Sequence, residues 1–171
     1  MSLERWQAGP IEAVPPLLQP VAHALLQAGD DVAAAAELPA DALWATPEGV
    51  ASVGWHLLHL AGSTDRLLTY ARGEQLSPEQ CATLDTERRL PDPRPAGSEL
   101  VERWNTVIAA AISQLGQTPD ADLLQPREIG RARLPTTVLG LLFHAAEHAA
   151  RHAGQVVTTM RLVTALPDSL D

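Results

Sequence analysis

The 171-residue sequence contains no lysine, and all twelve of its basic residues are arginines. Catalysis through a lysine Schiff base, including the chemistry of pyridoxal phosphate enzymes, is therefore excluded. Cys81 is the single cysteine, so an internal disulfide is impossible and nothing indicates secretion. No apolar run approaches the roughly 20 residues of a membrane span, and no apolar signal segment opens the sequence. We therefore expect a cytoplasmic protein with no membrane partner.

Aromatic residues are also scarce, at 4%, although 46% of the chain is hydrophobic. Alanine supplies much of that fraction, and alanine favours helices over strands. The net charge of −9 repels phosphate backbones, so we expect no nucleic-acid partner. The length suits one domain with a full hydrophobic core. We predict a single all-α domain over 1–171, with its core at about 17–165.

Prolines and glycines divide the chain into four candidate helices, at 17–37, 49–72, 98–116 and 136–165. Apolar residues recur in each at spacings of three and four, as in Leu100, Trp104 and Ile108. Ser98 is a candidate N-cap, and Gly73 follows the second helix as a helix-ending residue. Four helices of this length predict a four-helix bundle.

The longest connection indicates the topology of that bundle. About 25 residues separate the second and third candidate helices, whereas antiparallel neighbours usually need about 2–8. Such a segment, when extended, spans roughly 80 Å, more than twice the length of the helices. We therefore predict an up-down-down-up bundle with an overhand crossover at 73–97. The long third connection is expected to cover one end of the bundle.

The histidines form the most unusual pattern in the sequence. His144, His148 and His152 are spaced four apart, and His56 and His59 share the segment "GWHLLHLAG". Residues four apart on a helix face the same way, so His148 and His152 can hold one ion. Either His56 or His59 can supply a third ligand from the second helix. The alternative is that the three histidines of the last helix lie on a solvated face.

Two motifs, "WHLLHLAG" and "HAAEHAARHAGQ", make the chain resemble the DinB/YfiT-like superfamily of metal-dependent bundle proteins. The resemblance extends from about 17 to 165 and implies an up-down-down-up fold. It also implies that His59, His148 and His152 are the metal ligands. Members of the family are frequently homodimers, which we expect here too. Many members have arginine where this chain has Ala153, so no role of that arginine is carried over.

Several neighbours of the ligands are candidates for the pocket or for contacts behind the ligands. Ser63 and Arg66 follow His59 by four and seven residues and share its face. Gln155, three residues after His152, is placed for a hydrogen bond near the metal or for helix packing. The candidates for these supporting positions are His56, His144, Ser63, Arg66 and Gln155.

Other residues near these motifs are expected to be structural. Glu147 lies four residues before Arg151, a typical surface ion pair on a helix. Trp44 and Trp55 are expected to anchor the core.

Three neutral imidazoles leave a divalent ion able to activate water or a thiol. No serine or cysteine nucleophile with a positioned base is evident, so a reacting thiol would come from a low-molecular-weight cosubstrate. We therefore predict a metal-dependent thiol S-transferase or hydrolase acting on a small molecule, with zinc as the first choice of metal and nickel next. The alternatives are a non-enzymatic metal- or ligand-binding protein of the stress response, and a scaffold whose histidines bind nothing.

Overall fold

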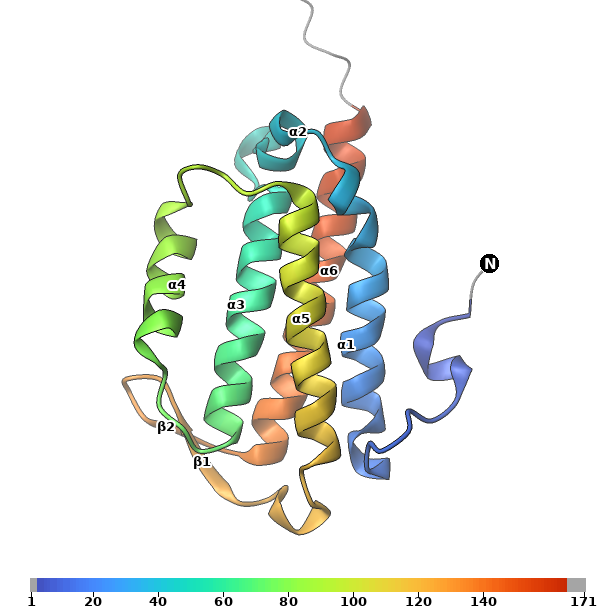
Figure 1. The fold of residues 1–171 in the computed structure, drawn as a ribbon, viewed down its shortest axis with the longest axis vertical. Coiled ribbons are helices and arrows are strands. Elements are labelled where there is room, and N and C mark those ends of the chain that lie inside the picture. Colours follow the sequence, from blue (N-terminus) through green and yellow to red (C-terminus); the bar gives the residue numbers. More distant parts are fainter. Residues whose placement is uncertain (1–2, 166–171) are drawn as a thin grey trace, which may run out of the picture.

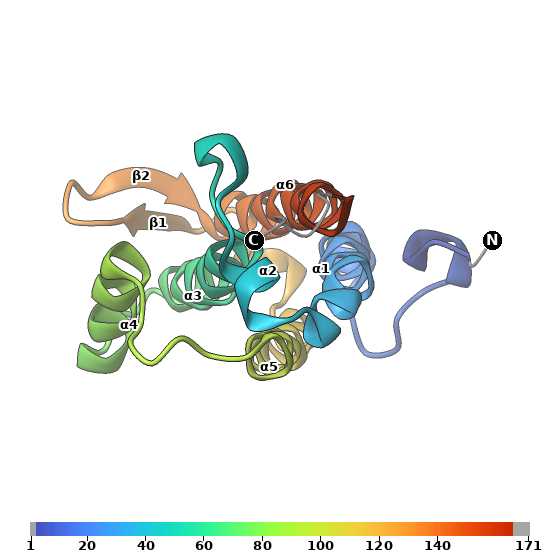
Figure 2. The same ribbon diagram turned by 90° about the horizontal axis from the view of Figure 1, so that it is seen from above.

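The computed structural model describes residues 3–165, which are mostly helical, and it confirms the predicted all-α class. The long helices lie side by side around a common centre (Figures 1 and 2). They are α1 (Gln19–Val32), α3 (Val53–Ala71), α5 (Gly97–Gly116) and α6 (Val138–Ala165). α6 packs most extensively against α3 and α1, while α5 contacts α1 and α3 on the other side.

Short elements connect and flank these helices. Two short α-helices are α2 (Ala40–Trp44) and α4 (Pro78–Arg89), and two strands are β1 (Pro126–Ile129) and β2 (Leu134–Thr137). The 3-10 turns are η1 (Arg5–Ala8), η2 (Pro16–Leu18), η3 (Ala33–Glu37), η4 (Pro47–Gly49) and η5 (Asp120–Asp122). Within the described residues, no helix is both long and apolar enough to cross a membrane.

Both ends of α3 follow from local sequence. The Ser52 hydroxyl accepts a hydrogen bond from the backbone N–H of Trp55 at 3.1 Å, which satisfies a donor that the first helical turn leaves free. At the other end, Gly73 adopts a φ of 80°, a left-handed conformation that glycine enters without steric cost. The predicted helix end before Gly73 is therefore confirmed.

The predicted start of α5 is wrong by one residue. The helix begins at Gly97, so Ser98 lies inside it, and Ala96 occupies the cap position. The Glu99 carboxylate accepts a hydrogen bond from the Ala96 N–H at 2.7 Å and replaces the expected serine cap. Gly97 is required for packing, because a Cβ there would lie 2.2 Å from the carbonyl oxygen of Ala35.

The segment 73–97, which we predicted as an overhand crossover, contains an additional helix, α4. The chain leaves α3 at the lower end of Figure 1, rises through α4 and enters α5 at the upper end. Ser77 and Gln80 form a capping box at the start of α4. The helix was missed because its sequence, PEQCATLDTERR, is polar on nearly every side and lacks an apolar stripe.

A β-hairpin occupies much of the third connection. β1 pairs antiparallel with β2, from Pro126 opposite Thr137 to Ile129 opposite Leu134. Residues 136 and 137 therefore belong to β2, and α6 begins at Val138 rather than at the predicted 136. Gly130 has a φ of 70° in the turn of the hairpin. The hairpin lies beside α4 on the outer side of α3 (Figure 2).

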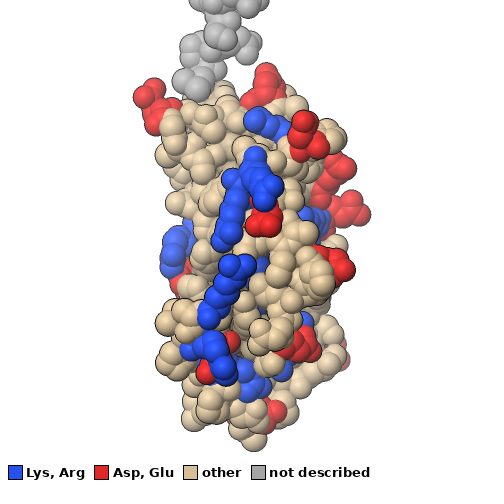
Figure 3. Space-filling model, turned by 90° about the vertical axis from the view of Figure 1, so that its left-hand side faces the viewer, with Lys and Arg blue, Asp and Glu red and all other residues tan. Residues whose placement is uncertain are grey.

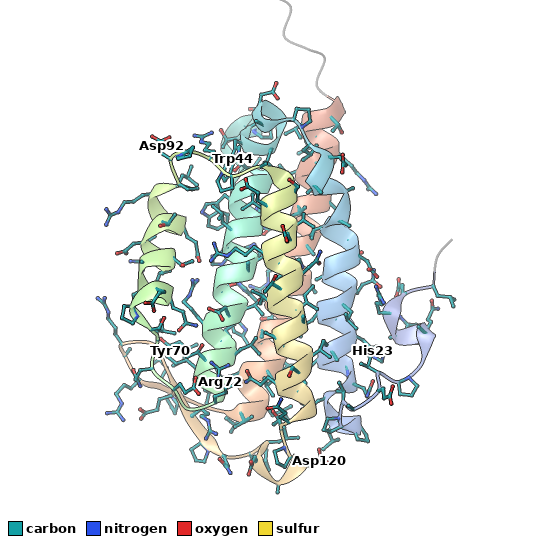
Figure 4. All side chains as sticks on the ribbon, in the orientation of Figure 1. His23, Trp44, Tyr70, Arg72, Asp92 and Asp120 are labelled. Atoms are coloured by element: carbon teal, nitrogen blue, oxygen red, sulfur yellow. The ribbon has the colours of Figure 1, made fainter. Side chains whose placement is uncertain are left out.

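Trp44 closes the upper end of the bundle, where Figure 4 places it near Asp92. Its indole is buried, as predicted, and its Nε1 donates to the Pro95 carbonyl at 3.2 Å. The Arg94 guanidinium lies 5.4 Å from the centre of the same ring, a cation–π distance. α2 is thereby joined to the segment that leads into α5.

Arginines gather in a column on the face formed by α4 and the hairpin (Figure 3). Several of the arginines on these elements are paired with carboxylates. Arg88 and Arg89 lie 3.8 and 4.0 Å from Asp85, and Arg133 pairs with Glu128. This surface is therefore one of mixed charge, although arginine stands out in the view.

Candidate metal centre

α3 and α6 bring together three histidines that are far apart in the sequence. His59 comes from the middle of α3, and His148 and His152 come from successive turns of α6. One ring nitrogen of each lies within 4.8 Å of the corresponding nitrogens of the other two. Nε2 of His59 and Nε2 of His148 are 3.0 Å apart. The three imidazoles therefore converge on one point from two helices.

This spacing is close to that of a coordinated ion. Zinc–nitrogen bonds of about 2.0–2.1 Å in a tetrahedral site put two ligand nitrogens roughly 3.3 Å apart, and two such bonds span at most about 4.1 Å. The 3.0 Å between the His59 and His148 nitrogens is near the tetrahedral separation of roughly 3.3 Å. All three nitrogens lie within 4.8 Å of one another, which exceeds the maximum of about 4.1 Å by less than about 1 Å. The three nitrogens therefore lie at distances close to those that one coordinated ion requires.

His148 and His152 of α6 are held in the neutral form, which is the form that binds metals. Burial, together with the nearby His59 and His144, lowers the pKa of His148 to about 4. Burial likewise lowers the pKa of His152 to about 3, with contributions from His148 and His59. Each of these two imidazoles therefore has one unprotonated nitrogen near neutral pH, which can bind a metal ion.

Glu87 of α4 supports His59 from behind. Its Oε2 lies 3.2 Å from Nδ1 of His59, the nitrogen that faces away from His148. Arg66 donates to both carboxylate oxygens, at 2.6 and 3.0 Å. Burial alone would raise the pKa of Glu87, but hydrogen bonds from His59 and Arg66 outweigh burial and hold that pKa below its usual value. Glu87 is therefore an ionised acceptor for His59.

His56 supports His152 in a similar way. The Nδ1 atoms of the two rings lie 3.0 Å apart, and His56 is only 5% exposed. Burial lowers the pKa of His56, which keeps this ring neutral too. Because His56 engages Nδ1 of His152, Nε2 of His152 remains available as a ligand atom. The structure thus places His59 in the group of three and His56 behind it.

The third ring, His148, lacks such support. Its Nδ1 is buried and has no hydrogen-bond partner among the described residues. Trp55 lies beside the cluster, with its indole stacked on His59 at a centroid distance of 5.0 Å and an interplanar angle of 6°. Trp55 is half-buried, so the prediction that it anchors the core is wrong: it forms a wall of the histidine cluster.

The remaining predicted residues lie outside the cluster. His144 is exposed and pairs with Glu147 at 2.8 Å, and Arg151 contacts the same carboxylate, so the predicted Glu147–Arg151 pair is confirmed. Ser63 is buried, donates to the Leu60 carbonyl and is not among the clustered residues. Gln155 is exposed on α6.

His23, the sixth histidine, lies on α1, on the opposite side of the bundle from α4 (Figure 4). It contacts the carbonyl of Gly9 and not the cluster.

Sequence reasoning missed Glu87 and the position of Trp55. Glu87 is 28 residues from His59 and lies on α4, a helix that the sequence analysis did not predict. No helical spacing therefore connects the two residues. Trp55 did offer a pattern, because it lies four residues before His59 and therefore on the same helix face.

The fold and the cluster together define a helical bundle with a histidine site between two of its helices. Comparison with known families agrees with this class: the sequence pattern of the DinB superfamily matches residues 24–156. The chain belongs to the DinB superfamily. No curated protein matches the sequence significantly.

Proposed function

We propose that His59, His148 and His152 bind one divalent metal ion and that the protein is a metal-dependent enzyme. The observation that carries the proposal is the convergence of three imidazole nitrogens within 4.8 Å of one another. The donor set fits the ion, because neutral imidazoles are ligands for zinc, nickel, copper and iron. Zinc is our first choice and nickel the second.

The geometry of the histidine cluster suits a catalytic metal site better than a site that only stores metal. Three protein ligands leave a coordination position open, whereas structural zinc sites close with four. The His59 side chain is 23% exposed, so a small molecule can reach the cluster from solvent. Trp55 supplies an apolar surface against which a substrate can rest. These features favour a reaction at the cluster.

A divalent ion in this site supplies Lewis acidity to a water molecule or a thiol. Burial keeps His148 and His152 neutral. The protein also orients two of the ligands by hydrogen bonds: Glu87 accepts from His59, and His56 pairs with His152. Cys81 is exposed on α4 and is not among the clustered residues, so a reacting thiol is supplied by a cosubstrate. The reaction classes are thiol S-transfer and hydrolysis.

We also infer the finer architecture of the family for this chain. The courses of α1, α3, α5 and α6 in Figure 1 support an up-down-down-up bundle formed by a single domain. In this arrangement α3 and α5 run parallel, which accounts for the long link that carries α4 between them.

The test combines metal analysis with an activity assay on untagged protein. We expect about one equivalent of zinc or nickel per chain, and its loss in His148→Ala and His152→Ala with the helical circular dichroism unchanged. Free cysteine with a fluorogenic alkyl bromide, and a panel of activated esters, then test S-transfer and hydrolysis. Metal binding without turnover of any pair would favour a metal-binding protein, and absence of metal would overturn the proposal.

A further inference from the structure

α4 is attached to the bundle in an unusual way. Of its twelve residues, all described by the structure, Glu87 is the only one that is buried, at 3% exposure. Gln80 adds hydrogen bonds to Asp65 and to Thr69, both at 2.7 Å. An amphipathic helix normally docks through apolar side chains, but α4 docks through a carboxylate and an amide. Its contact with α3 is therefore polar and specific.

α3 has an opening at the point where Glu87 enters. A Cβ on Gly62 would lie 1.9 Å from Oε1 of Glu87 and 2.8 Å from Nη1 of Arg66. No side chain larger than glycine fits there without displacing the ion pair. The sequence of α3 thus accommodates a carboxylate delivered by another helix, three residues after His59 and one turn before Arg66.

The charges in this group determine where the hydrogen of His59 lies. An ionised carboxylate only accepts hydrogen bonds, and Arg66 donates to both oxygens of Glu87. The 3.2 Å contact with His59 therefore requires the hydrogen on Nδ1 of that ring. Nε2 is then left with its lone pair, and Nε2 is the atom that faces His148.

We propose that α4 is a positioning helix for the metal centre, in which Glu87 fixes the tautomer and the orientation of His59 so that Nε2 faces the ion. The inference rests on the proposed metal site and deepens it. Glu87 does not touch the metal; it acts through His59, and Arg66 and Gly62 hold the carboxylate in place.

A purely structural role is the competing explanation, and energetics argue against it. Replacing a buried ion pair by apolar residues of similar volume is often neutral or stabilising. Leucine or methionine at these positions would hold α4 at least as well. What the ion pair adds is the third contact, to His59, and such contacts behind a histidine ligand typically change metal affinity about 10–100-fold when removed.

The decisive variant is therefore the double substitution Arg66→Met/Glu87→Leu. It removes both charges together and leaves neither buried alone, so we expect an unchanged urea midpoint for the metal-free protein. We expect the dissociation constant for Zn²⁺, measured by competition with a chromophoric chelator, to rise about 10–100-fold. Glu79→Gln is the matched control, because Glu79 is exposed on the same helix and should leave the affinity unchanged.

Glu87→Gln provides a second variant if the double substitution does not fold. It keeps the shape of the side chain but removes its charge, and we expect weaker zinc binding by about tenfold. An affinity equal to that of the parent protein in either folded variant would overturn the proposal.

Nitrogen NMR of histidine-labelled, metal-free protein separates this inference from the proposed function. We expect His59 in the Nδ1–H tautomer in the parent protein and in Glu79→Gln, and a shift towards Nε2–H in Arg66→Met/Glu87→Leu. If the parent protein binds no metal, the proposed function fails while this measurement still tests the positioning role. An Nε2–H tautomer for His59 in the parent protein would overturn that role.

Discussion

Two helix interfaces of this bundle are built on opposite principles. Between α1 and α5 the contact is apolar and close, with Ile108 packed so near Gly29 that a Cβ on the glycine would lie 2.7 Å from its Cδ1. Between α3 and α6 the middle of the interface is occupied by histidines, among them His56 and His152 at 8% exposure or less. The first interface is packed mainly by apolar side chains, and the second contains a group of buried histidines.

The difference shows which part of the molecule stabilises the fold and which part serves another purpose. Burying an apolar side chain stabilises by about 1.5–3 kcal/mol, whereas burying a polar ring gains nothing unless it is hydrogen-bonded. The Nδ1 of His148 has no such partner among residues 3–165. Apolar residues would pack the α3–α6 interface at lower cost, so its histidines are best explained by binding.

The largest expected effect on stability concerns the apolar core. Trp104 of α5 is fully buried in the core. Trp104→Ala should lower the free energy of unfolding by about 3–5 kcal/mol, measured by urea denaturation, because it removes the buried area and leaves a cavity. Trp6→Ala is the control, since Trp6 is 65% exposed and its loss should change stability by no more than about 0.5 kcal/mol. Equal effects in both variants would contradict the division of roles.

The next effect tests the histidine interface. Free zinc at about 100 times its dissociation constant should raise the free energy of unfolding by about 2.7 kcal/mol, because the ion binds the folded chain. The same addition should leave His152→Ala unchanged, as it removes one of the clustered rings. Urea curves at fixed free zinc provide the measurement. Stabilisation of the variant as large as that of the parent protein would show that zinc binds elsewhere.

Acid should weaken the histidine interface before it affects the rest of the molecule. The pKa is lowered to about 4 for His148 and to about 3 for His152, so the unfolded chain takes up protons at these rings first. Stability of the metal-free protein is then constant above about pH 6.5, the unfolded value, and falls as the pH drops towards 4 and then 3.

The loss at about pH 5 should be on the order of 2 kcal/mol, after a discount for the partial exposure of His148. Urea curves between about pH 7.5 and 5 measure it. The paired carboxylates, whose pKa values lie below 4.5, contribute only at lower pH. The double variant His148→Ala/His152→Ala should lose clearly less stability than the parent protein over this range, and what remains is due to His56, whose pKa is also lowered by burial. An equal loss in that variant would assign the effect to other groups.

The features that the sequence predicts are those that follow from regular spacing along one helix. Apolar spacing located the long helices, and the His-x-x-x-His interval placed His148 and His152 on one face of α6. α4 was missed because a helix that docks through Glu87 carries no apolar stripe. The link from Glu87 to His59 joins residues on two different helices, so it depends on how α4 packs, which no local pattern encodes.

The choice between His56 and His59 shows the same limit. Both lie on α3 three residues apart, and spacing alone left the third position open to either. The structure separates them by the direction of each ring: His59 presents Nε2 to His148, whereas His56 meets the rear nitrogen of His152. Side-chain orientation of this kind follows from packing, not from sequence interval.

The smallest expected effect concerns His144, which shares its helix face with the cluster but lies outside it. Its ring centre is 5.5 Å from that of His148, yet its Nδ1 pairs with Glu147 in an exposed position. His144→Ala should leave zinc affinity unchanged and alter stability by no more than about 0.5 kcal/mol, because only a surface pair is lost. Chelator competition and urea denaturation, alongside His148→Ala, measure both quantities. A loss of affinity comparable to that of His148→Ala would extend the metal centre one turn further along α6 and place its ligands partly in solvent.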